Sequence, residues 1–179
     1  MKRTIFLTTI AFAMVLFITS SCSLLDIEKE FEIEIPWSPY DADPNLYTTY
    51  LLDAQESSSV IADYSDKIKS LEVTEASFLV TSFVATDGLT ISNANLYVAD
   101  ADGTNQTLLA QEFMQKPQDN MVTPKVFSLE QAGLDKLENL LKNSPNQVFF
   151  VVSGTGSTAP IDFDFKVILK IKLTANPTE

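Results

Sequence analysis

Two segments near the ends of the chain alternate between apolar and polar residues. In residues 28–35, Phe31, Ile33 and Ile35 stand at every second position, with glutamates between them. In residues 161–173 phenylalanine and aliphatic residues alternate with Asp and Lys, and Ile168 is the one exception. Because successive side chains of a strand point to opposite faces, each segment predicts a strand with one buried face.

The polar faces of these two predicted strands carry opposite charge. The charged positions are Glu30, Glu32 and Glu34 in the first segment and Lys166, Lys170 and Lys172 in the second. We therefore expect the strands to be neighbours in one sheet, where carboxylates would stand opposite ammonium groups. The alternative is that both faces are merely solvated and the strands belong to different sheets.

Further strands are predicted between these two. They cover residues 67–85, 89–99, 107–113 and 148–152. The alternation slips near Glu75 and again midway through 89–99, which predicts β-bulges. Residues 46–53 are ambiguous; as a strand they would place Leu46, Thr48, Tyr50 and Leu52 on one face. Asp100–Gly103 reads as a hairpin turn, and Gly154–Ser157 as a loop.

One convincing helix is predicted over residues 128–142. Ser128 would cap it, with Gln131 completing a capping box three residues later. Its buried stripe would be formed by Leu129, Gly133, Leu137, Leu140 and Leu141. A shorter helix is possible over 57–64. Short strands at turn-punctuated intervals with one crossover helix predict a mainly β protein, a sandwich of seven to nine strands.

The first residues are typical of an export signal. Lys2 and Arg3 precede an uncharged apolar stretch, residues 5–18. As a helix this stretch would reach about 21 Å, short of the ~30 Å hydrocarbon core of a bilayer. Its length and basic start therefore favour a signal peptide over a membrane span.

The signal stretch ends in Ile18-Thr19-Ser20-Ser21-Cys22, which resembles a bacterial lipobox. The resemblance implies cleavage before Cys22 and a lipid on its thiol, although Thr19 replaces the usual aliphatic residue. An ordinary secretory cut after Ser21 is the alternative. Cys22 is the only cysteine of the chain, and lipidation would explain an unpaired thiol in an oxidising compartment.

The expected organisation is a lipoprotein signal peptide at 1–21, a short lipid-proximal linker at 22–27 and one β-sandwich domain at 28–175. Cleavage leaves 158 of the 179 residues, enough to bury a core. The mature chain keeps all 24 acidic residues and only 10 basic ones, a net charge of −14. Such a chain is a poor partner for nucleic acid, so we expect none.

Several segments together resemble small Gram-negative cell-envelope lipoproteins with an immunoglobulin-like sandwich. They are Ile68–Val73, the Asp-Gly-Leu-Thr-Ile-Ser of 87–92, the Leu-rich helix and the closing alternating strand. The resemblance implies the fold and an exported, lipid-anchored location. Because Ser23 stands where an inner-membrane retention signal has Asp, it implies the outer membrane. The families concerned are mostly of unknown function, so the resemblance predicts no activity.

The residues offer little for catalysis, metals or cofactors. The chain contains no histidine, which excludes Ser-His-Asp and Cys-His mechanisms and His-ligated metals. Asp162 and Asp164 would share one solvated strand face, and Asp100-x-Asp102-Gly103 matches a calcium loop at too few positions. Gly154-x-Gly156 lacks the third glycine of a dinucleotide fingerprint. We therefore expect no enzyme, no cofactor and no metal.

Aromatic residues with a polar tip are unevenly distributed. Residues 37–64 hold Trp37, Tyr40, Tyr47, Tyr50 and Tyr64, the only Trp and four of the five Tyr. Such side chains suit both binding surfaces and sandwich lids. We expect a non-catalytic envelope lipoprotein, a structural or interaction module held to the membrane by its lipid. The alternative is a lipoprotein that binds a glycan or protein through Trp37, Tyr40, Tyr47 and Tyr50.

Overall fold

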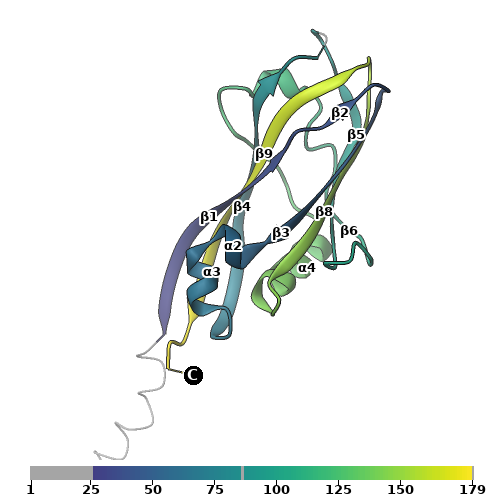
Figure 1. Ribbon diagram of the computed structural model, residues 1–179. Coiled ribbons are helices and arrows are strands. Elements are labelled where there is room, and N and C mark those ends of the chain that lie inside the picture. The colour runs from purple at the N-terminus through teal and green to yellow at the C-terminus, as the bar shows by residue number, and fades with distance from the viewer. Residues whose placement is uncertain (1–25, 86, 179) are drawn as a thin grey trace, which may run out of the picture.

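The structure is a computed structural model that describes residues 26–85 and 87–178 (Figure 1). The predicted signal peptide and Cys22 lie outside the described residues. The strands are β1 (Ile27–Trp37), β2 (Tyr40–Asp41), β3 (Asn45–Asp53), β4 (Ile68–Phe83), β5 (Ile91–Ala99), β6 (Thr107–Ala110), β7 (Lys125–Val126), β8 (Gln147–Gly156) and β9 (Ile161–Ala175). The helices are α2 (Ala54–Ser57), α3 (Ser59–Tyr64), the 3-10 helix η2 (Pro117–Asn120) and α4 (Gln131–Lys142).

The strands form two antiparallel sheets that pack face to face. The first sheet has the order β1-β9-β4-β7, with β2 also on β9, and the second has the order β3-β8-β5-β6. The predicted β-sandwich with one crossover helix is confirmed. Its connectivity is not the immunoglobulin-like one, which keeps the first two strands side by side in one sheet. Here the first strand lies beside the last, the order of a jelly roll.

The predicted pairing of the first and last strands is confirmed. β1 runs antiparallel to β9 from Ile27 opposite Ala175 to Trp37 opposite Phe165. Residues 28–35 therefore belong to the fold and are not a tether. The three β9 lysines form ion pairs on both sides of the strand, two with β1 and one with β4. These pairs are Lys166–Glu34 (2.7 Å), Lys172–Glu28 (3.1 Å) and Lys170–Glu75 (2.7 Å).

Both predicted interruptions of the alternation are confirmed. The register of β4 on β9 shifts between Val73 and Glu75. The register of β5 on β8 shifts between Ser92 and Asn95, around Asn93 with φ +51°. The loop predicted at Gly154–Ser157 is wrong in extent, because β8 continues to Gly156. The chain then crosses from the second sheet to the first instead of forming a hairpin.

Helix α4 begins later than predicted. Its first residue is Gln131 and its N-cap is Glu130, so Ser128 does not cap it. The Glu130 amide instead donates to the Leu109 carbonyl at 2.8 Å, which holds the residues before the helix extended beside β6. The predicted stripe is correct at its centre, since Gly133, Leu137 and Leu141 are buried.

The shorter helix is also present, divided into α2 and α3. The Ser58 side chain caps α3 by accepting from the Ile61 amide at 3.5 Å. Within the described residues, no helix is long and apolar enough to cross a membrane.

Candidate functional site

The aromatic window predicted as a ligand site is divided between the interior and the surface. Trp37 is 4% exposed and stacks on Phe165, with ring centroids 5.1 Å apart and planes 9° apart. Tyr50 packs beside it at 5.7 Å and Phe150 meets it edge-on at 6.2 Å. Trp37 is thus part of the core, where a surface ligand does not reach it, and Tyr50 is partly buried against it.

The other tyrosines of the window point in different directions. Tyr64 is partly buried and packs on the core from α3. Tyr40 lies on β2, beside the first sheet, and is 69% exposed. Tyr47 lies on β3 in the second sheet and is 62% exposed. The window therefore does not form one surface, and only Tyr40 and Tyr47 are freely available for contact.

Tyr47 belongs to a different set of side chains, those on the outward face of the second sheet. In β3 the residues Leu46 and Leu52 are buried inside, so Tyr47, Thr49 and Leu51 point outward. The register brings two further strands alongside. We call this set of nine residues the uncharged face: Tyr47, Thr49 and Leu51 of β3, Ser153, Val151 and Phe149 of β8, and Asn95, Tyr97 and Ala99 of β5.

The burial of individual residues confirms that this face is separate from the interior. Val151 is 1% exposed and Ala99 0%, yet neither belongs to the cluster of residues that forms the core. The larger outward side chains around them cover them. Leu51 remains 49% exposed beside them. The face is therefore an apolar floor bordered by larger side chains, three of them aromatic.

The two outer faces of the sandwich differ in charge. The outer face of the first sheet carries the lysines of β9 and the glutamates of β1 and β4 described above. The uncharged face has no ionisable carboxylate or ammonium at any of its nine positions. In a chain with 24 acidic residues, this neutrality sets the second sheet apart.

Two carboxylates at the ends of strands of the uncharged face, Asp53 of β3 and Asp100 after β5, already have partners. The Asp53 side chain accepts from the amides of Gln55 and Glu56 at the start of α2 and from Gln147 Nε2 at 2.8 Å. The Gln147 hydrogen bond, followed by those backbone amides, lowers the pKa of Asp53 from its ordinary value. Asp100, the second one, follows directly after Ala99.

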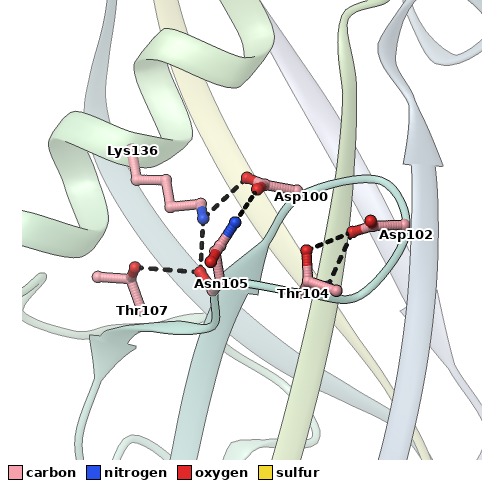
Figure 2. Close-up of polar contacts among 6 residues, drawn as sticks. All are labelled: Asp100, Asp102, Thr104, Asn105, Thr107 and Lys136. Atoms are coloured by element: carbon pink, nitrogen blue, oxygen red, sulfur yellow. Dashed lines mark hydrogen bonds and ion pairs between the residues drawn. The ribbon is translucent and has the colours of Figure 1, made fainter.

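Figure 2 shows the Asp100 carboxylate bound within the β5–β6 turn and to helix α4. Lys136 Nζ lies 2.8 Å from Asp100 Oδ1 and also donates to the Asn105 carbonyl. Asn105 Nδ2 donates to Asp100 Oδ2 at 2.7 Å, and Thr104 donates to Asp102 through its amide and its hydroxyl. Asp100 and Asp102 therefore bind separate partners within the turn. The sequence predicted a turn here, and this is confirmed.

The same turn shields one edge of the uncharged face. Gly103 has φ +81°, and an ideal Cβ on it would lie 3.5 Å from the Phe149 ring. The hydrogen bonds from Asn105 and Lys136 lower the pKa of Asp100, and those from Thr104 lower the pKa of Asp102. The lowered pKa values favour charged, hydrogen-bonded carboxylates at Asp100 and Asp102, in the turn that borders Phe149.

A separate polar pocket of about 230 Å³ lies beside the β5 bulge. Its lining includes Asn93 and Glu112, both in the left-handed region with φ +51° and +45°, and Lys116. Gln115 Nε2 donates to Glu112 Oε2 at 3.0 Å across it. Among residues 26–85 and 87–178, no group of three or more His, Cys, Asp or Glu could hold a metal ion.

Comparison with known proteins gives no family for this chain. No protein-family model and no curated protein matches the sequence. Among solved structures, one of Desmodium yellow mottle tymovirus is similar at a TM-score of 0.38 and 14% identity, covering 84% of this chain and 81% of that one.

Sequence reasoning missed Tyr97, Phe149 and Leu51 as surface residues. Local density of Tyr and Trp does not reveal this face, because it is assembled from three strands far apart in the sequence. A signal was present in residues 148–152, which are apolar throughout. An antiparallel strand with a solvated face normally alternates, so an unbroken apolar run indicates apolar side chains on the outer face too.

Proposed function

We propose that the chain is an exported, non-catalytic lipoprotein, anchored to the cell envelope through Cys22 and acting as an interaction module. The observation that carries this proposal is the short chain between the lipid-bearing cysteine and the fold. Asp26 already pairs with Lys69 of β4 at 2.7 Å, and β1 begins at Ile27. Cys22 and Asp26 can be at most about 14 Å apart along an extended chain.

This short connection sets how the domain would stand on its membrane. β1 begins and β9 ends at the same end of the sandwich, and the turn around Gly88 lies at the opposite end (Figure 1). A lipid on Cys22 would hold the first end near the bilayer. The β3, β8 and β5 strands run along the long axis, so the uncharged face would stand sideways to the membrane, open to a partner.

Mass spectrometry of the mature protein tests the anchor. We expect an N-terminal Cys22 that carries diacylglycerol, and we expect Cys22→Ser to release the protein into the soluble fraction. Ser23→Ala is the matched control, because it changes the neighbouring residue and keeps the thiol; it should stay with the membrane. A wild-type protein that begins at an unmodified Cys22 or Ser23 would contradict the proposal.

A further inference from the structure

The uncharged face has the size of a small-ligand site. Strands lie about 4.8 Å apart and residues rise about 3.4 Å along each, so three strands by five residues span roughly 10 Å by 14 Å. That footprint is on the order of 150 Å². A stable protein interface buries about 800 Å² on each partner, several times more. The uncharged face alone is therefore too small to form a stable interface with a second copy of the chain or with another protein.

The chemistry of the face favours a ligand that is neutral and amphipathic. Tyr47, Tyr97 and Phe149 offer flat apolar area, because their rings stand around the Val151 floor. Asn95, Ser153 and Thr49 add amide and hydroxyl groups to the same face, and Asn95 Nδ2 donates to the Tyr97 hydroxyl at 3.5 Å. A purely apolar ligand would leave the remaining donors and acceptors of these groups without hydrogen bonds, which is unfavourable.

Charged ligands match the surroundings less well. The chain carries many more acidic than basic residues, so an anion would be repelled. A cation would find Asp100 already paired with Lys136 at 2.8 Å, and the Asp53 side chain already accepts from two backbone amides and from Gln147 Nε2. A sugar ring has an apolar face of C–H groups and a rim of hydroxyls, and it carries no charge.

We propose that the uncharged face binds a neutral oligosaccharide, with rings stacked on Tyr47 and Tyr97 and hydroxyls hydrogen bonded by Asn95 and Ser153. This rests on the proposed function, because a module anchored in the cell envelope would meet glycans there. The proposed site differs from the aromatic window of residues 37–64, because its residues come from three strands. Trp37 takes no part, because it is buried against Phe165.

Affinity electrophoresis of the full processed chain provides the test. The protein is acidic, with an isoelectric point near 4.3, and migrates in native gels that contain dextran, xylan, galactomannan or laminarin. Polyoxyethylene detergent keeps the lipid soluble without adding sugar headgroups. Titration calorimetry with the hexasaccharide of each retarding polysaccharide then gives the association constant at low and at high NaCl.

The variants Tyr47→Ala and Tyr97→Ala remove one ring each, and Tyr40→Ala is the control. Tyr40 is as exposed as Tyr47, at 69% against 62%, and lies beside the other sheet. We expect Tyr47→Ala to lower the association constant about tenfold or more, as a stacked anchor residue would. Tyr40→Ala and high NaCl should leave it unchanged. Circular dichroism confirms that each variant is folded.

Several results would overturn the inference. They are no retardation by any of the four neutral polysaccharides, equal losses in Tyr47→Ala and Tyr40→Ala, and loss caused instead by Lys116→Ala in the pocket beside the β5 bulge. A wild-type dimer that Tyr47→Ala dissociates would assign the face to a second copy instead. Acylation of Cys22 is measured separately. An acylated protein that binds no glycan therefore overturns this inference and leaves the anchor standing.

Discussion

Replacing Gly133 with alanine tests how α4 is joined to the sandwich. A Cβ at this position would lie 2.2 Å from the Leu108 carbonyl oxygen and 2.6 Å from Leu109 Cα. Ordinary contact begins near 3.4 Å, so the helix must move away from β6 by about 1.2 Å. The obstructing atoms belong to the backbone and cannot rotate aside.

The expected cost follows from two opposing effects. Forcing extra volume into a packed site costs about 1–3 kcal/mol, and a backbone clash on this scale belongs at the upper end. Alanine favours the helix over glycine by about 1 kcal/mol, which offsets part of this cost. We expect a net loss near 2 kcal/mol in the free energy of unfolding. For a domain of this size the melting temperature should fall by roughly 4–8 °C.

Urea denaturation followed by tryptophan fluorescence measures this loss. Trp37 is the only tryptophan and is buried in the core, so its emission reports unfolding. Ala132→Gly is the matched control on the exposed side of the same turn, where helix propensity alone acts and costs about 1 kcal/mol. If Gly133→Ala is neutral or stabilising, propensity outweighs packing, and the close approach of α4 to β6 is refuted.

Two further predictions concern charge. Glu34→Lys should weaken the partly exposed pair with Lys166 by about 0.2–1 kcal/mol; Lys166→Glu alongside it should restore part of the loss in a urea double-mutant cycle, whereas strictly additive effects would mean that the two side chains do not interact. Folding lowers the pKa of Asp100 from its ordinary value of 3.8. The charged Asp100 therefore stabilises the folded state above pH 3.8, and this stabilisation is lost as the pH falls through the pKa that Asp100 has in the folded protein. The stability gap between wild type and Asp100→Asn should therefore shrink in acid urea titrations, and a constant gap would contradict the turn geometry.

Alternation and charge predicted the pairing of the first and last strands well. Each strand face was readable because its period is two, and two of the three lysines of β9 do pair with glutamates of β1. The strand order was not readable in the same way. Alternation shows which side of a strand is buried but not which strand lies beside it, so an immunoglobulin-like and a jelly-roll order fit the same pattern.

Local contacts explain the wrong details as well. Ser128 and Gln131 have the spacing of a capping box, yet the Glu130 amide finds its acceptor on Leu109 of β6. A tertiary hydrogen bond therefore decides where the helix begins. The residues of the aromatic window do not share one surface for the related reason that Tyr47 and Tyr50, three residues apart on one strand, point to opposite faces.

The contrast between the two outer faces has a physical consequence. The outer face of the first sheet carries paired and solvated charges, which favour contact with water. The second sheet exposes Tyr47 and Leu51 together, and apolar side chains gathered on a surface favour association with other molecules. Because β3 is also an edge strand, an uncharged outer face beside it adds to the risk of aggregation between sheets.

A single lysine at Thr49 would reduce that risk at little structural cost, since this position is exposed. Keeping the face neutral is therefore understandable if a neutral ligand covers it. A Thr49→Lys variant should accordingly remain folded and soluble while losing affinity for the oligosaccharide that retards the wild-type protein.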